Sequence, residues 1–139
     1  MNTSGRAVKA ATRWFHNEHK IYQGSDSSLI PKFLIFHDDL DIGLGEVKLK
    51  QPSRASRGHN GLKSISEVLQ EDYPRLRVGI GRPGKSKDTK VISDYVLGRF
   101  KPSEEDVLAN QSVPQTLELI DAILSSGVIY QENDRSNEL

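Results

Sequence analysis

The sequence contains no cysteine, which excludes a disulfide framework and any metal site built on thiolate ligands. It also contains no apolar run of membrane-spanning length, and its first residues do not have the pattern of a signal peptide. Hydrophobic residues make up only 35% of the 139 positions, yet a chain of this length can still bury one core. We therefore expect one globular domain without a membrane partner.

An excess of either charge is also missing, since 19 Lys and Arg residues balance 19 Asp and Glu residues. The two signs are nevertheless segregated along the chain. Residues 44–101 carry thirteen cations and six acids, whereas residues 102–139 carry one cation and eight acids. A basic middle segment is typical of proteins that bind a phosphate backbone. The same charges also fit a solvated surface that the acidic tail balances in space.

Hydrophobic periodicity alternates between helix and strand along the chain, which predicts an α/β fold. Helices are expected at residues 4–16, 60–70 and 103–126, the last interrupted by Pro114, and strands at residues 33–36, 46–50 and 75–80. The domain is expected to occupy residues 1–130, and residues 131–139 to form a polar tail.

Some of these elements carry more specific expectations. The strand at 33–36 is apolar throughout, as a central strand covered on both faces would be. Alternation along 46–50 places Val47 and Leu49 toward the core, with Lys48 and Lys50 outward. Alternation along 75–80 places Arg75 and Arg77 together on the solvent face. Trp14 falls on the apolar stripe of the first helix and is expected in the core. A capping box of Ser103 and Asp106 is expected to begin the last helical region, and Gly127 to end it.

Residues 37–63 hold the strongest candidates for a functional site. The strand at 33–36 leads into an acidic cluster at 37–41, so carboxylates would lie at the edge of a sheet. Residues 57–63 are expected to form a loop entering a helix, where Gly58 frees the backbone and Asn60 caps the helix. Two such loops predict the floor of a site, although each alone also fits an ordinary turn or cap.

Several motifs occur in an order that carries a family resemblance. They are MNTSG at residues 1–5, HDDLD at 37–41, RGHNGLK at 57–63, RLRVGIGRPG at 75–84 and YVLG at 95–98. Together they resemble bacterial-type peptidyl-tRNA hydrolases over most of residues 1 to about 110. The resemblance implies a mixed sheet flanked by helices in a monomer that needs no metal or other cofactor. It also implies cleavage of the ester between a peptide and the 3′ end of tRNA, in the cytoplasm or a mitochondrion.

The resemblance assigns roles to individual residues. Asp38 matches the carboxylate that orients and polarises the catalytic histidine, and Asn60 matches the amide that contacts the substrate near the scissile ester. His59 lies beside Asn60 in the same substrate-facing loop, and Asn2 matches the asparagine that binds the peptide. Lys50 and Arg77 match cations placed toward the tRNA. The wider cationic face expected for tRNA adds Lys48, Arg54, Arg57, Arg75, Arg82, Lys85 and Lys87.

One part of the family's pattern has no counterpart in this sequence. The family's base is a histidine that follows a strand ending in an Asn-Pro-Gly turn, in an N-terminal segment. None of the four histidines, His16, His19, His37 and His59, occupies that position. We therefore expect the domain to lack its N-terminal part and to hydrolyse peptidyl-tRNA slowly or not at all. A non-catalytic RNA-binding relative and a general α/β interaction domain remain alternatives.

Overall fold

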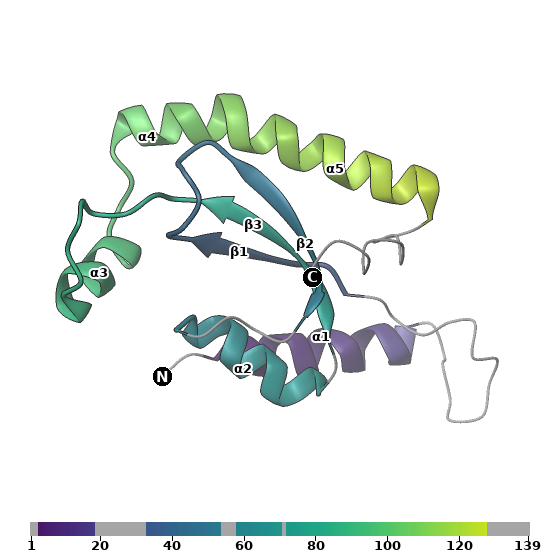
Figure 1. Cartoon of the computed structure of the whole chain (residues 1–139). Helices are drawn as coiled ribbons and strands as arrows, with labels where there is room; N and C mark the ends of the chain where they lie inside the picture. The colour runs from purple at the N-terminus through teal and green to yellow at the C-terminus, as the bar shows by residue number, and fades with distance from the viewer. Residues whose placement is uncertain (1–2, 19–32, 54–57, 71, 128–139) are drawn as a thin grey trace, which may run out of the picture. The chain divides into compact units, whose positions relative to one another are not determined.

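A computed structural model describes residues 3–18, 33–53, 58–70 and 72–127 (Figure 1). The chain forms two compact units, each built from two separate segments. The first unit contains Met1–Leu34 and Pro52–Tyr73, and the second contains Ile35–Gln51 and Pro74–Leu139.

The first unit is built on two helices, α1 (Ser4–Glu18) and α2 (Asn60–Leu69), which lie side by side (Figure 1). Gly5 allows their close approach, because a Cβ atom at this position would collide with the carbonyl oxygen of Ser64. The amide nitrogen of Gly5 also donates a hydrogen bond to the Ser64 hydroxyl at 3.0 Å. The contact between the helices is therefore fixed at a residue without a side chain.

Leu62, Ile65 and Tyr73 form the buried part of this unit. The Tyr73 hydroxyl donates to the Leu62 carbonyl oxygen at 3.2 Å, which satisfies a polar group that would be costly to bury alone. Leu62 and Ile65 are the buried apolar side chains of α2, which begins and ends close to the helix predicted at residues 60–70. The prediction for Trp14 is wrong, since this residue is 62% exposed.

The second unit contains a sheet of β1 (Ile35–Asp39), β2 (Val47–Ser53) and β3 (Tyr73–Gly79), although the last residues of β2 and the first of β3 belong to the first unit. The strand order is β1-β3-β2, and β1 pairs with β3 in parallel. The α/β class with a mixed sheet flanked by helices is confirmed. The expectation of a central strand at 33–36 is wrong, because β1 begins at Ile35 and lies at an edge, with Phe36 49% exposed.

The central strand is instead β3, and it is covered on both faces. Four consecutive residues of β3 are buried, which an alternating strand with one solvent face cannot show. Arg75 is only 3% exposed, so the prediction that it lies on a solvent face is wrong. The alternation predicted for β2 is confirmed, with Val47 and Leu49 half-buried and Lys48 and Lys50 exposed.

The rest of the second unit is helical. Its elements are α3 (Thr89–Val96), α4 (Pro102–Val107), the π-helical turn η2 (Leu108–Ser112) and α5 (Val113–Ser126). Figure 1 shows α4 to α5 as one continuous helical ribbon, so the interruption expected at Pro114 takes the form of the wider turn η2 just before it. Gly127 ends α5 as predicted, with φ of 66°.

Two caps differ from the sequence-based expectation. α4 begins at Pro102, and the Glu104 carboxylate accepts a hydrogen bond from the Lys101 amide at 2.7 Å. The predicted capping box of Ser103 and Asp106 is therefore wrong. Asn60 is the first residue of α2, and its neighbour His59 is the cap. Among the described helices, none combines the length and apolar content needed to cross a membrane.

The close contact at Gly5 predicts a specific loss of stability in the variant Gly5→Ala. Overpacking costs about 1–3 kcal/mol, and the better helix propensity of alanine returns up to about 1 kcal/mol. We expect the free energy of unfolding, measured in urea, to fall by about 1–2 kcal/mol. Ala10→Val, on the exposed side of α1, should change it by less than about 1 kcal/mol. A Gly5→Ala protein as stable as the parent would contradict the close approach.

Candidate functional site

The carboxyl ends of β1 and β3 carry the acidic cluster of the second unit. Asp38 is paired in register with Val78, and Asp39 with Gly79. Because the strands are parallel, both carboxyl ends meet at one edge of the sheet, where sites in α/β folds commonly form. The prediction that an apolar strand delivers carboxylates to a sheet edge is therefore confirmed.

The loop at residues 40–46 is held tightly against the end of β3. The amide nitrogens of Gly79, Ile80 and Gly81 donate hydrogen bonds of 2.9 to 3.0 Å to carbonyl oxygens of this loop and of Asp39. Gly79 leaves no space for a side chain, since a Cβ atom would collide with the Gly43 carbonyl oxygen. Ile42 is buried, at 4% exposure. The acidic loop thus has a fixed shape at this edge.

Two ion pairs cross this edge. The Arg77 Nε atom donates to Asp39 Oδ2 at 2.8 Å, and Arg82 contacts Asp41 Oδ1 at 2.6 Å. Burial raises the pKa of the Asp39 carboxyl, whereas hydrogen bonds from Arg77 and the Asp41 amide, together with the charge of Arg77, lower it. The lowering effects prevail, so the pKa of Asp39 lies below its usual 3.8. Sequence reasoning missed this pair, because it assigned Arg77 to tRNA and no role to Asp39.

Asp38 lies between His37 and Asp39, whose side chains both make hydrogen bonds of their own. Successive side chains of a strand point to opposite faces, so Asp38 faces away from the side on which Asp39 binds Arg77. The buried ring of His37 lies with Nδ1 2.7 Å from the Asp38 carbonyl oxygen. A carbonyl oxygen only accepts, so this nitrogen carries the proton and donates it.

The other predicted site residues lie in the first unit, at the start of α2. His59 Nδ1 accepts a hydrogen bond from the Leu62 amide at 3.2 Å, which identifies His59 as the N-cap. Its Nδ1 lone pair is used in this bond, so the proton of the neutral ring lies on Nε2. Asn60 follows with an exposed side chain. The prediction that Asn60 caps the helix is wrong by one residue.

The cations predicted to bind tRNA differ in their exposure. Lys48, Lys50, Lys85 and Lys87 are exposed, although Lys48 also lies 3.2 Å from the Glu46 carboxylate. Arg75 is buried, whereas the side chain of Arg82 is 46% exposed. Asn2, Arg54 and Arg57 lie outside the described residues. Within the described residues, no group of three or more His, Asp and Glu side chains is placed to hold a metal ion.

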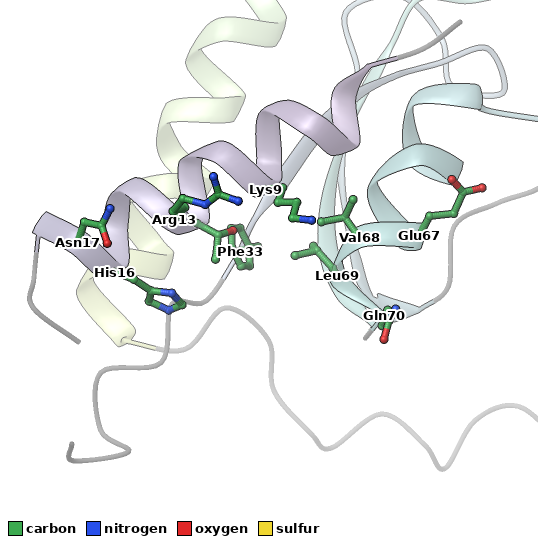
Figure 2. A pocket seen from close by; sticks show the side chains of 10 residues that line it. Lys9, Arg13, His16, Asn17, Phe33, Glu67, Val68, Leu69 and Gln70 are labelled. Carbon is green, nitrogen blue, oxygen red and sulfur yellow. The ribbon is translucent and has the colours of Figure 1, made fainter. Parts of the chain in front are cut away.

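The first unit also contains a hollow of about 730 Å³ between α1 and the end of α2 (Figure 2). Lys9, Arg13 and His16 line it from α1, and Val68 and Leu69 line it from α2. The sequence analysis assigned no role to this region. The regular spacing of Arg6, Lys9 and Arg13 along the first helix was the signal that could have indicated it.

The Asp39–Arg77 pair predicts a stability that depends on acid pH. A lowered folded-state pKa stabilises the fold above the unfolded-state value and loses that stabilisation as the pH falls through the folded value. We expect Asp39, followed by NMR, to titrate below 3.8. In Arg77→Gln its pKa should rise, because burial is then opposed only by the Asp41 amide and the charge of His37. Arg82→Gln, which breaks only the pair with Asp41, should leave Asp39 unchanged. Titration of Asp39 above 3.8 in the parent would disprove the account.

Comparison with known proteins assigns the chain to a family. The profile of the family described as peptidyl-tRNA hydrolase matches residues 1–138. A peptidyl-tRNA hydrolase from Wolinella succinogenes is 43% identical over 124 residues, which cover 89% of this chain and 56% of that protein. One from Synechocystis is 38% identical over 129 residues, covering 92% and 58%. One from Rickettsia bellii is 34% identical over 126 residues, covering 91% and 60%.

Solved structures agree with these sequences. The crystal structure of peptidyl-tRNA hydrolase from Acinetobacter baumannii matches with a TM-score of 0.64 and 30% identity, covering 91% of this chain and 56% of that one. A complex of peptidyl-tRNA hydrolase with N-propanol matches with the same values. This chain spans little more than half the length of the proteins it matches. The chain belongs to the peptidyl-tRNA hydrolase family.

Proposed function

We propose that this chain supplies part of a site that hydrolyses the ester between a peptide and the 3′ end of tRNA. The observation that carries the proposal is the family match along residues 1–138, with Asp38, His59 and Asn60 present at the positions to which the resemblance assigns roles. The proposal extends to a monomer that uses no metal and works in the cytoplasm or a mitochondrion.

The chemistry of the reaction gives each residue a task. Attack of water on an ester requires a base for the water, a group that orients the base, and donors for the developing oxyanion. Asp38, at the end of β1, can hold an imidazole in the tautomer that leaves one nitrogen able to accept a proton. The exposed amide of Asn60 can donate to the ester oxygen.

His59 fits the binding of substrate and not the role of base. Its Nδ1 atom already accepts the Leu62 amide proton, and its Nε2 atom carries the proton of the neutral ring. A base must offer a lone pair, which His59 could do only by breaking the cap of α2. The Nε2 hydrogen can instead be donated to an oxygen of the substrate.

The other described histidines are no better placed to act as the base. His37 is buried at 9% exposure, and its Nδ1 atom donates to the Asp38 carbonyl oxygen. His16 lies on α1 beside the hollow. We therefore propose that the base is supplied by a histidine other than His16, His37 and His59.

This reasoning predicts slow hydrolysis by the 139-residue chain. Release of labelled peptide from peptidyl-tRNA should be slow or absent with this chain alone. Fusing the segment of the Wolinella succinogenes relative that carries the family's catalytic histidine should raise the rate by supplying the base. Equal turnover with and without the added segment would place the base within the 139 residues and overturn the assignment. Binding of tRNA without hydrolysis in either form would support a non-catalytic relative instead.

Two variants of the extended protein test the assigned roles. Asp38→Asn keeps the shape of the side chain but favours the wrong tautomer of the base. That change costs about 10⁴-fold in serine proteases, and we expect a smaller loss here because water is activated. Asn60→Ala should lower the rate by about 10²-fold by removing an oxyanion donor. Asp41→Asn, in the same acidic loop but paired with Arg82, is the matched control and should retain most of the rate.

We also propose that exposed cations of the second unit bind the tRNA backbone. This set contains Lys48, Lys50, Arg82, Lys85 and Lys87. We leave out Arg75 because it is buried, and Arg77 because it is held by Asp39. Charge reversal at Arg77 would therefore disturb the edge of the sheet, so it does not give a clean test of binding.

The cationic set predicts a steep dependence of tRNA affinity on salt. If about five phosphates are contacted, log K should fall with log salt at a slope of roughly −3.5 to −4.5. Lys48→Glu/Lys50→Glu should weaken binding and make the slope shallower. Arg99→Glu/Lys101→Glu changes the net charge equally at exposed positions outside the set and is the matched control. Affinity that is indifferent to salt, or equal effects of the two variants, would count against the proposed surface.

A further inference from the structure

One exposed face of α1 carries cations that the proposed site does not use. Arg6, Lys9 and Arg13 follow one another at helical spacing, and all three are exposed. The first turn of α1 contains no acidic residue, and none of the ion pairs between described residues engages these three cations. The result is a row of positive charge about 10 Å long, from the helical rise of 1.5 Å per residue, that no acid among the described residues pairs with.

An exposed aromatic ring accompanies this row. Trp14 follows Arg13 directly and is 62% exposed. The side of α1 that meets α2 carries Gly5, with Val8 and Phe15 half-buried, so the core does not use Trp14. Trp14 points about 100° away from Arg13 around the helix. An exposed ring on the same helix as exposed cations is a combination with which proteins stack the bases and bind the phosphates of single-stranded nucleic acid.

The hollow between α1 and the end of α2 borders this row (Figure 2). Lys9 and Arg13 belong both to the row and to the lining of the hollow, whose other side chains include Phe33, Val68 and Leu69. Its volume of about 730 Å³ lies in the range of ordinary ligand sites. The lining also contains the Glu67 carboxylate of α2, so the cations outnumber the acid there by two to one. Cations beside apolar side chains suit a phosphate that carries a flat, weakly polar base.

We propose that α1 and this hollow form a site for single-stranded RNA. Arg6, Lys9 and Arg13 bind successive phosphates, and Trp14 stacks one base of the strand. The inference deepens the proposed function, because it gives the RNA partner a second surface, in the first unit, whereas the described tRNA-binding cations belong to the second.

The alternative of a membrane surface fits α1 less well. A helix that lies in a bilayer interface needs a broad exposed apolar face opposite its cations. Within the described residues of α1, Trp14 is the only large apolar side chain that is exposed. The remaining apolar residues of the packed side face α2, so a single ring would carry the whole membrane contact.

The single tryptophan of the protein makes the test direct, since fluorescence at Trp14 reports on this surface alone. Titration with an octauridylate should quench Trp14, with log K falling against log salt at a slope of roughly −2 for three contacts to a single strand. Arg6→Glu/Lys9→Glu/Arg13→Glu should weaken the quenching association at least tenfold. Lys63→Glu/Arg99→Glu/Lys101→Glu changes net charge equally at exposed positions and should leave it unchanged.

Stacking is tested separately with fluorescently labelled octauridylate and anisotropy. Trp14→Leu should weaken binding about fivefold or more, because the stacking of a base on an aromatic ring is lost. Trp14→Phe should restore most of the affinity, since a ring is again present. Circular dichroism of each variant should match the parent, because all substituted positions are exposed. Equal affinity of the Leu and Phe variants would overturn the stacking role.

Further outcomes separate this inference from the proposed function. If Lys48→Glu/Lys50→Glu weakens RNA binding and the triple variant of α1 does not, the second surface is disproved while the proposed function stands. The reverse result supports the surface on α1 and counts against the tRNA-binding set. Tripolyphosphate that quenches Trp14 as strongly as octauridylate would overturn base recognition. Trp14 emission that shifts with anionic phosphatidylserine vesicles but not with RNA would favour a membrane surface and overturn the inference.

Discussion

The parallel pairing of β1 with β3 is the constraint on which the candidate site depends. It brings the carboxyl ends of both strands to one edge, so that the loop after β1 and the loop after β3 start beside each other. The loop at 40–46 can reach the end of β3 only because Gly79 has no side chain. A larger residue there would displace Gly43 and, with it, the backbone that carries Asp39 and Asp41.

The same edge decides which charges are available to a ligand. Arg77 and Arg82 reach back to Asp39 and Asp41, so two of the arginines expected to meet tRNA first neutralise the acidic loop. The Asp39–Arg77 pair is mostly shielded from water, with side chains 12% and 28% exposed, whereas the pair of Arg82 is open to solvent. Surface pairs contribute little and are screened by salt, so Arg82 can exchange its partner for a phosphate more easily than Arg77 can.

Sequence reasoning succeeded where a local rule decides the outcome. The alternation of Val47 and Leu49 and the glycine stop at Gly127 depend only on near neighbours, and both are confirmed. Sequence reasoning failed where burial or strand position depends on pairing with segments far away in the sequence. Arg75 alternates like a surface residue, but its strand is the middle one, a position set by pairing with residues far away in sequence. The edge position of β1 and the partner of Arg77 depend on the same long-range pairing.

The error at Trp14 has a physical cause that also explains the exposed face of α1. The sequence-based prediction assumed that all large apolar side chains at helical spacing face the core, and it therefore placed Trp14 inward. Helices approach most closely where a side chain is absent, and here that point is Gly5, which contacts Ser64 of α2. Anchoring α1 at Gly5 turns a neighbouring stripe toward α2, so Trp14 faces outward, while Lys9 and Arg13 lie at the border of the hollow. The close approach that stabilises the first unit therefore also determines which side chains α1 presents to a ligand.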